Sequence, residues 1–446
     1  MREIRDPIHG FITIDDTLEP FLNLAVMHRA RRIKQTALTY LVYPGANHTR
    51  FEHLLGCMHI ARRLSEQLIP MQSVRDIVRI AALLHDIGHG PLSHVSEQLF
   101  EQYTDPSIRQ ELTDDIHEEI TATLIRYDEE ISKLVGKYQD QVIELILKAK
   151  RRTVEHDIIN GPFDADKLDY LLRDSYYSGV KYGVFDLERI IRSVVRLQSG
   201  PESYMGIEED GFWAVEQLVL AKRYMTLQVY RHRIRLITDA MYVRAVQYAI
   251  DEGIKEIREL YSFVPTKEYV KRYLYWDDES VFRTILEKSS GVAKGYINRL
   301  RSRNLLKEVY SKNIKGFTDA PIRNRISKLT FSDSKNAERE IAHILDRHLN
   351  PKKIDPAFVI IYLLTIDNPT YRPPSIEIKI NDILIHYKNG KVDSADNYPD
   401  SIIGSADEDK QNFIYVYAEM DGIDEGNRMK VKQAIDSEIT EVFANI

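Results

Sequence analysis

The segment that most constrains this chain is Ile80–Val95, which reads IAALLHDIGHGPLSHV. An apolar run leads directly into His85 and Asp86, and glycines and a proline then end the helix that the run predicts. His89 and His94 follow in the broken part. Imidazole and carboxylate groups are the ligands that hold catalytic divalent metals, and a buried His–Asp pair is costly unless something compensates it. A single such dipeptide would more often be incidental, but three histidines and an aspartate within ten residues indicate a metal site.

An upstream segment predicts a further ligand on an amphipathic helix. From Phe51 to Leu68 the apolar residues recur at helical spacing. Arg50 and His53 lie three positions apart in the first turn, so they share a face at a helix end that already favours anions. Beside this cation we interpret His53 as a metal ligand and not as a core histidine.

The segment Asn160–Asp174, NGPFDADKLDYLLRD, adds a third group of polar side chains. Asp164 is predicted to cap a helix that starts after the turn. One face of that helix then presents Asp166, Asp169 or Tyr170, and Arg173 or Asp174. Acidic residues in a first turn are common for dipole reasons alone, but such a face also fits a site for phosphate and metal.

The bulk composition limits the class of protein. With 446 residues, 43% of them apolar, the chain can bury a large core in two or more domains. The net charge of −7 argues against a protein that coats nucleic acid or an anionic membrane as a whole. The single cysteine, Cys57, fits a buried structural thiol in a reducing compartment. No secretory signal and no apolar run long enough to span a bilayer is visible, so we expect a cytoplasmic location.

The hydrophobic periodicity predicts a mainly α fold with a smaller C-terminal α+β unit. We expect an all-helical core over residues 1–320 and a second domain over residues 321–446. The segments expected to be regular include an extended Met1–Leu18, helices at Glu19–Ala37, Ser73–Asp86 with Ser73 as N-cap, and Trp213–Ile250, strands at Val359–Thr365, Ser375–Tyr387 and Asn412–Ala418, and a closing helix at Asn427–Ala444.

Two His-containing pairs need separate interpretation. His117 and Glu118 open a predicted helix, where they fit proton-transfer groups and an ordinary N-terminal cap equally well. His156 and Asp157 form a second His-Asp dipeptide, but no apolar helix precedes them and no glycine and histidine cluster follows. We therefore predict a structural role for this second pair.

Four motifs in order resemble the HD-domain metal phosphohydrolases, and more narrowly the deoxynucleoside triphosphate triphosphohydrolases (dGTPase-like). They are DPIHG at Asp6–Gly10, PGANHTRFEH at Pro44–His53, HDIGHGPLSH at His85–His94 and FDADKLDYLLRD at Phe163–Asp174. The likeness covers about Met1–Leu306. It implies an all-helical HD-domain core that hydrolyses a deoxynucleoside triphosphate to the deoxynucleoside and triphosphate.

The resemblance also implies a metal centre. Its ligands would be His53, His85, Asp86 and Asp166. They would hold one divalent transition metal (Mn, Fe, Zn or Ni), with Mg²⁺ as a partner of the substrate phosphates.

Further residues are implied to act on the substrate. The polar groups around the α-phosphate would be His89, His94, His117 and Glu118. Tyr170 would lie under the deoxyribose and exclude a 2′-hydroxyl. The full set of implied substrate contacts is Gln35, Arg50, Lys167, Tyr170, Asp174, Lys222, Arg223 and Tyr230.

The resemblance further implies a homo-oligomer, a dimer or tetramer, with a nucleotide effector at a subunit interface. One alternative is another HD phosphohydrolase, such as a phosphodiesterase or 5′-nucleotidase. The other is a nucleotide-sensing regulator that binds nucleic acid, which the basic stretches Arg29–Lys34, Lys148–Arg152 and Lys294–Arg303 motivate. No membrane association is expected.

Overall fold

A computed structural model describes residues 2–112, 114–147, 152–317, 319–327, 329, 331–349, 353–364, 382–399, 401 and 412–445. Most of these residues are helical, which confirms the mainly α fold class with a smaller α+β region at the C-terminus. The chain divides into two compact units. Unit 1 comprises Met1–His232, Arg258–Val281 and Ile376–Asp407, and unit 2 comprises Arg233–Ile257, Phe282–Ser375 and Glu408–Ile446. The sequence-based boundary at residue 320 falls inside unit 2 and stays a prediction.

Unit 1 begins with a hairpin, as the extended N-terminal pattern predicts. Strand β1 (Arg2–Asp6) pairs antiparallel with β2 (Gly10–Ile14). The next elements are η1 (Glu19–Asn23), α1 (Ala25–Ala30) and η2 (Ala37–Leu41). The single helix predicted over Glu19–Ala37 is therefore wrong: Leu24 has an extended backbone with ψ 147° that separates η1 from α1.

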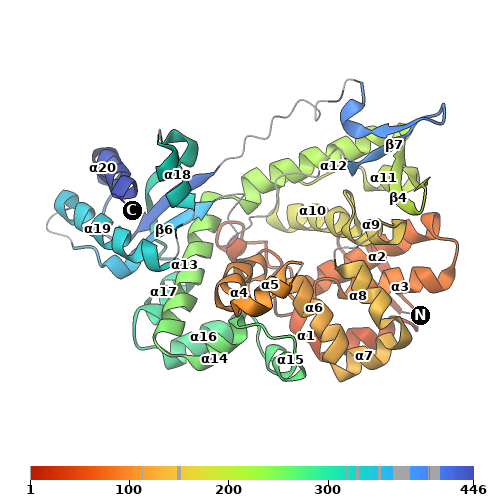
Figure 1. Ribbon diagram of the computed structural model, residues 1–446, viewed down its shortest axis with the longest axis horizontal. Helices are drawn as coiled ribbons and strands as arrows, with labels where there is room; N and C mark the ends of the chain where they lie inside the picture. The colour runs from red at the N-terminus through yellow and green to blue at the C-terminus, as the bar shows by residue number, and fades with distance from the viewer. Residues whose placement is uncertain are drawn as a thin grey trace. The chain divides into compact units, whose positions relative to one another are not determined.

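Two long helices, α2 (Arg50–Leu68) and α3 (Gln72–Leu84), run side by side in unit 1 (Figure 1). Helix α2 starts where predicted because Thr49 and Glu52 form a capping box, which satisfies two backbone N–H groups of the first turn. The N-cap of α3 is Met71, so the prediction of Ser73 was wrong. Ser73 lies inside the first turn of α3 instead.

The helices that follow build the rest of the core of unit 1. They are η3 (Ser93–Ser96), α4 (Glu97–Tyr103), α5 (Pro106–Glu111), α6 (Ile116–Tyr127), α7 (Glu129–Val135), η4 (Gly136–Tyr138), α8 (Gln139–Ile146), α9 (Val154–Asn160), α10 (Ala165–Ser178) and α11 (Leu187–Ser193). Asp164 caps α10 as predicted and accepts the N–H of Lys167 at 2.8 Å. Asp157 accepts the N–H of Met205 at 2.9 Å, which fits the structural role predicted for the second His-Asp dipeptide.

A small sheet in unit 1 joins two distant parts of the chain. Its strands are β3 (Val194–Ser199), β4 (Glu202–Glu208), β7 (Leu384–His386) and β8 (Val392–Ser394), in the order β3-β4-β7-β8. Strand β7 pairs parallel with β4, while the other two pairs are antiparallel. The strand predicted at Ser375–Tyr387 lies partly outside the described residues, and its described end forms β7 in this sheet.

The long helix predicted over Trp213–Ile250 is interrupted. After η5 (Glu209–Gly211), α12 (Phe212–Met225) passes into a π-helical turn, η6 (Thr226–Tyr230), before α13 (Arg233–Asp251) begins. Such π turns occur preferentially at functional sites. The next helices are α14 (Lys255–Tyr261), α15 (Lys267–Tyr273), α16 (Asp278–Lys288) and α17 (Val292–Arg301).

Unit 2 contains a three-stranded antiparallel sheet packed with helices. Its strands are β5 (Lys307–Asn313), β6 (Val359–Leu364) and β9 (Phe413–Ala418), in the order β5-β9-β6. Its further helices are η7 (Ile314–Gly316), α18 (Ala320–Ser327), α19 (Phe331–Leu349), η8 (Pro356–Phe358) and α20 (Glu425–Asn445), and η10 (Ala395–Asn397) belongs to unit 1. Ile341, Val416 and Ile435 are among the residues of one buried core. The strands predicted at Val359–Thr365, of which Thr365 lies outside the described residues, and at Asn412–Ala418 are present as β6 and β9, and the closing helix is confirmed.

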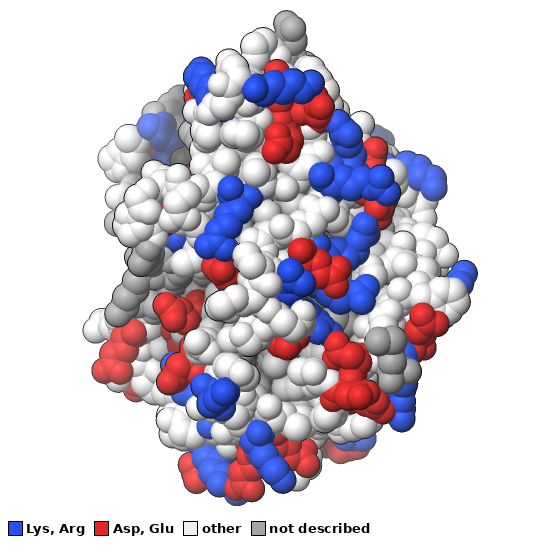
Figure 2. Space-filling model, turned by 90° about the vertical axis from the view of Figure 1, so that its right-hand side faces the viewer, with Lys and Arg blue, Asp and Glu red and all other residues white. Residues whose placement is uncertain are grey.

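The charged side chains on the face drawn in Figure 2 are of both signs. Lys and Arg lie there among Asp and Glu, in keeping with the net charge of −7. A protein that binds nucleic acid along one face concentrates positive charge there. Within the part of the chain that the structure describes, no helix combines the length and the apolar character that crossing a bilayer requires.

The buried His59 on α2 predicts a loss of stability in acid. Burial, with help from His9, Arg62 and Arg63, lowers the pKa of His59 to about 4. The unfolded chain, in which this histidine has a pKa of about 6.5, therefore binds the proton first as the pH falls. We expect His59 to cost about 2 kcal/mol of unfolding free energy between pH 8 and pH 5. In urea titrations His59→Gln should lose correspondingly less over this range; equal losses in variant and wild type would contradict the assignment.

Candidate metal centre

Four potential ligands from three segments of unit 1 converge. His53 lies in the first turn of α2, His85 and Asp86 follow α3, and Asp166 lies in the first turn of α10. His53 Nε2 is 3.0 Å from Asp166 Oδ1 and 3.6 Å from Asp86 Oδ2. His85 Nε2 is 3.7 Å and 3.6 Å from the same two oxygens. Both imidazoles thus lie near both carboxylates. His53, His85 and Asp166, with Cys57, form one group of side chains that could hold a metal ion, and Asp86 belongs with His89 and His117 to an adjacent one.

The imidazole of His85 is oriented for a ligand. Its Nδ1 lies 2.9 Å from the carbonyl oxygen of Ala82, which selects the tautomer with the proton on Nδ1 and leaves a lone pair on Nε2. This Nε2 atom is buried and makes no hydrogen bond among the described residues. A buried polar atom without a partner is costly, and a bound cation would supply the missing interaction.

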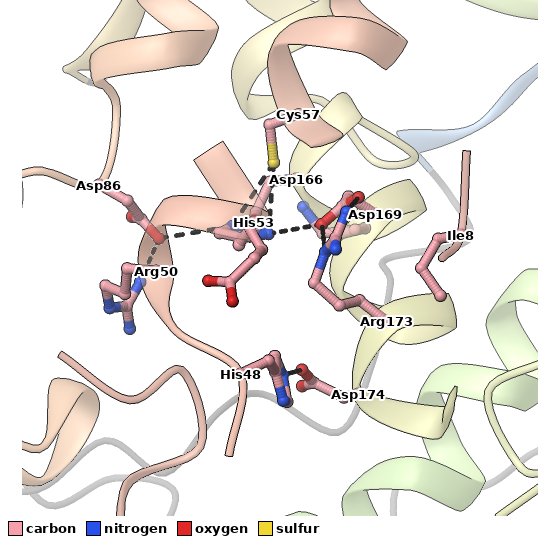
Figure 3. A network of polar contacts seen from close by, with 12 residues as sticks. Ile8, His48, Arg50, His53, Cys57, Asp86, Asp166, Asp169, Arg173 and Asp174 are labelled. Atoms are coloured by element: carbon pink, nitrogen blue, oxygen red, sulfur yellow. Dashed lines mark hydrogen bonds and ion pairs between the residues drawn. The ribbon is translucent and has the colours of Figure 1, made fainter. Parts of the chain in front are cut away.

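The other imidazole is oriented by a buried carboxylate that the sequence did not single out as its partner. Asp169 Oδ2 lies 2.9 Å from His53 Nδ1, so the Nε2 lone pair of His53 points to the candidate ligands (Figure 3). Arg173 donates two hydrogen bonds to Asp169, at 2.8 and 2.9 Å, and a third to Asp6 at 2.8 Å. His9 Nε2 lies 2.7 Å from Asp169 Oδ1. Asp6 and His9 of the DPIHG motif therefore help to orient the candidate ligand His53, because they bind Arg173 and Asp169.

The electrostatics of the cluster favour a cation. Burial by itself raises the pKa of Asp166, but its interactions with the neighbouring His53 and His85 outweigh burial and lower it well below its usual range. The carboxylate of Asp166 is therefore ionised at neutral pH. Arg50 forms an ion pair with Asp86 and fixes the carboxylate at the edge of the cluster. Burial raises the pKa of the Cys57 thiol, and its sulfur lies 3.5 Å from both ring nitrogens of His53.

A second polar group lies on the other side of Asp86. His89 Nε2 is 3.5 Å from Asp86 Oδ1, and the rings of His89 and His117 stack with centroids 3.9 Å apart. Glu97 Oε1 is 3.2 Å from His117 Nδ1 and 3.6 Å from His89 Nδ1. Burial lowers the pKa of His117, but Glu97 outweighs burial and raises it to about 10, so this histidine carries a proton at neutral pH.

The structure distinguishes the two carboxylates near His117. Glu118 accepts the backbone N–H of Asp115 at 3.1 Å in the capping box of α6, so the capping interpretation of this residue is the one observed. Glu97, which sequence reasoning missed, is the carboxylate that lies beside the ring of His117. Only its position at the start of α4, close behind the histidine-rich motif, could have indicated it. His94 is exposed, and its ring centroid lies 4.7 Å from that of His89.

The groups predicted to bind the sugar and base form a connected set in α10 and η6. Asp174 accepts a hydrogen bond from the hydroxyl of Tyr230 at 2.7 Å, and its other oxygen lies 2.6 Å from His48 Nε2. The rings of Tyr170 and Tyr230 meet edge to face, with centroids 6.2 Å apart. Sequence reasoning had missed His48, although it lies inside the PGANHTRFEH motif.

The remaining predicted contacts are placed as follows. Lys167 Nζ donates to the carbonyl oxygen of Gly161 at 3.1 Å and pairs with Asp164. Gln35 is buried, and its Oε1 has no hydrogen-bond partner among the described residues. On α12, Lys222 is buried and Arg223 is half-buried. The contacts of these four side chains with a substrate stay predictions.

The donor set fits a divalent transition metal. Two neutral imidazole nitrogens and two carboxylates are the ligands that zinc, iron, manganese or nickel accept in proteins. Both imidazoles are oriented by a hydrogen bond on their other nitrogen, as is usual for metal-bound histidines. The unpartnered Nε2 of His85 is the observation that points most directly to an ion.

The segment that carries these residues also matches a known protein family. The sequence profile of the HD domain matches residues 50–174, and that of an HD associated region matches residues 185–363. The chain is 39% identical over 260 residues to an uncharacterised protein of Methanocaldococcus jannaschii, covering 58% of this chain and 52% of that protein. It is 35% identical over 262 residues to the uncharacterised protein YwfO of Bacillus subtilis, covering 56% of this chain and 57% of that protein. The chain thus spans about half the length of these curated relatives.

More distant relatives and a solved structure extend the comparison. The human deoxynucleoside triphosphate triphosphohydrolase SAMHD1 is 24% identical over 410 residues, which cover 82% of this chain and 63% of that protein. The crystal structure of a phosphohydrolase from Bacteroides thetaiotaomicron shares the fold, with a TM-score of 0.71 at 24% identity, over 94% of this chain and 99% of that one. With the HD domain, its associated region and the converging histidines and aspartates all present, the chain belongs to the HD-domain family and is similar to its deoxynucleoside triphosphate triphosphohydrolases.

Proposed function

We propose that this protein hydrolyses deoxynucleoside triphosphates to the deoxynucleoside and triphosphate. The observation that carries the proposal is the convergence of His53, His85, Asp86 and Asp166 beside a second group of histidines. The distant relatives named as deoxynucleoside triphosphate triphosphohydrolases support the choice of substrate. A bound divalent metal would lower the pKa of a water molecule and neutralise charge on the phosphate.

The residues around the centre have separate roles in this proposal. Arg50, fixed by Asp86, and Lys167 on α10 stabilise the negative charge that grows on the phosphate oxygens. His94 or His117 donates a proton to the leaving 5′-oxygen. Glu97 holds the imidazole of His117 in place. Asp174, paired with His48 and Tyr230, receives the sugar hydroxyl.

The reaction is tested by its products. The purified protein is incubated with Mn²⁺ and each deoxynucleoside triphosphate in ¹⁸O-labelled water, and the phosphorus products are separated by anion exchange. We expect intact triphosphate that carries one ¹⁸O atom, because water attacks the α-phosphorus and the 5′-oxygen leaves. Release of inorganic phosphate or pyrophosphate would assign the centre to a different phosphate ester and contradict the proposal.

Sugar discrimination gives a further prediction. If Tyr170 lies under the deoxyribose, its removal opens space for a 2′-hydroxyl. Tyr170→Ala should therefore lower the ratio of kcat/KM for a deoxynucleotide over the matching ribonucleotide by about 10-fold or more. Tyr176→Ala is the matched control, because Tyr176 lies on the same helix but is 59% exposed. An unchanged ratio in Tyr170→Ala would exclude this residue as the sugar gate.

The proposal includes a homo-oligomer with a nucleotide effector. Light scattering after gel filtration, with and without a deoxynucleoside triphosphate, tests both parts. A dimer or tetramer whose rate rises when a second nucleotide is added supports them. A monomer at micromolar concentration with hyperbolic kinetics for every nucleotide pair contradicts them.

A further inference from the structure

The loop after Asp86 carries His89, and His94 follows it in the short turn η3. It runs from Ile87 to Ser93, between the end of α3 and the short turn η3. Leu92 and Ser93 have positive φ angles of 59° and 55°, a left-handed conformation that is unfavourable for residues with a side chain. Such a conformation persists only where the surroundings hold it.

Side chains from outside the four motifs hold the carbonyl groups of this loop. Arg29 on α1 is buried and donates to the carbonyl oxygens of Ile87 at 3.3 Å and His89 at 2.9 Å. The hydroxyl of Tyr273, also buried, donates to the carbonyl oxygen of Gly88 at 2.6 Å. Three consecutive carbonyls are thus bound by side chains from α1 and α15.

Arg29 and Tyr273 also contact each other, and Asp278 binds the end of the loop that has positive φ angles. The guanidinium of Arg29 lies over the ring of Tyr273, 4.4 Å from its centroid. The buried carboxylate of Asp278 accepts the N–H of Leu92 at 2.7 Å and the N–H of Lys34 at 2.9 Å. Arg29 further donates to the carbonyl oxygen of Trp276 at 2.7 Å, which ties α1 to the segment that carries Asp278.

We propose that Arg29, Tyr273 and Asp278 form a clasp that holds residues 87–92 and thereby positions His94 for proton transfer. These three are positioning residues, because they contact only the backbone of the loop and not the candidate ligands. The clasp fixes where the imidazole of His94 points, while the residues that would hold a metal lie on α2 and α10 and directly after α3. The catalytic part of this inference rests on the proposed phosphohydrolase function, but its structural part does not.

The test uses a pair of matched variants on one helix. Tyr273→Phe removes only the hydroxyl that binds Gly88 and keeps the ring under Arg29. Tyr269→Phe, one turn earlier on α15, removes an equally buried hydroxyl that donates to the carbonyl oxygen of Leu260 at 2.8 Å, away from the loop. A general effect of losing a buried hydrogen bond would change both variants alike.

Hydrogen exchange measures the clasp without reference to activity. In Tyr273→Phe we expect the amides of residues 88–94 to exchange about 10-fold faster than in the wild type, while those of residues 53–58 on α2 are unchanged. Tyr269→Phe should leave the exchange of residues 88–94 at the wild-type rate. Wild-type exchange of the loop in Tyr273→Phe would overturn the clasp, whichever phosphate ester the protein hydrolyses.

Steady-state kinetics test whether the clasp positions the imidazole for catalysis. In Tyr273→Phe we expect kcat per bound metal ion to fall about 10-fold, while KM changes less than about threefold. The alkaline limb of the pH profile of kcat should also move. The reason is that a displaced imidazole donates its proton less well. Arg29→Lys should keep more activity than Arg29→Met. Faster loop exchange with an unchanged kcat and pH profile would overturn the catalytic role, as would a loss explained wholly by lower metal content. An error in the proposed substrate would be detected separately, because the wild type would then release phosphate or pyrophosphate instead of triphosphate.

Discussion

Asp166→Asn is expected to abolish metal binding and hydrolysis together. The substitution keeps the size of the side chain but removes the negative charge that His53 and His85 share at 3.0 and 3.7 Å. Because metal-dependent hydrolysis requires the ion to activate water, we expect the rate to fall on the order of 10³-fold or more. Mass spectrometry of the purified protein should find about one transition-metal ion per chain in the wild type and close to none in the variant.

The chain offers a matched control for this experiment. His156→Ala alters the second His-Asp dipeptide, whose aspartate binds Arg152 and the backbone of Met205. Metal content and rate should both stay at the wild-type level in this variant. A chelator followed by Mn²⁺ should restore the wild type and His156→Ala but not Asp166→Asn. Full metal content and full activity in Asp166→Asn would refute the assigned centre.

Gly56→Ala is expected to reverse the usual effect of alanine in a helix. Alanine normally stabilises a helix interior by about 1 kcal/mol relative to glycine. At position 56 of α2, however, an added Cβ would overlap with Asp169 Oδ1 and would lie 2.5 Å from Arg173 Nη2. Both side chains are fully buried and paired, so neither can move away without losing its partners. We expect a loss of about 3 kcal/mol in unfolding free energy.

The same substitution should weaken the metal centre, because Asp169 orients the ligand His53. Displacing such a supporting carboxylate typically lowers metal affinity roughly 10–100-fold. Calorimetric titration with Mn²⁺ or Zn²⁺ measures this change. Asp169→Asn should lower the affinity without the steric clash. Glu66→Ala, at an exposed position of the same helix, should change stability by less than about 0.5 kcal/mol. A Gly56→Ala protein as stable as the wild type, with unchanged metal affinity, would contradict the close approach of α2 and α10.

The local pattern of the sequence determined the elements that carry the centre. The apolar stripe from Phe51 and the apolar run before His85 predict α2 and α3, and both are present. Asp164 caps α10 as expected, because capping depends on residues within one turn. The resemblance of four motifs selected His53, His85, Asp86 and Asp166 as the ligands. Periodicity and capping reflect interactions between residues that are close in the sequence. They therefore predicted the helices and the helix cap, which depend on such interactions.

Only the tertiary structure decided which polar groups support the centre. From spacing alone Asp169 and Tyr170 were equivalent on one helical face, and packing against α2 makes Asp169 the partner of His53. Glu118 satisfies its own helix end, while Glu97 reaches His117 from another helix. The contacts of Arg29 join residues 58 to 247 positions apart in the chain. A buried carboxylate or guanidinium takes whichever partner packing brings within reach, and that choice depends on how distant segments meet and not on the residues beside it.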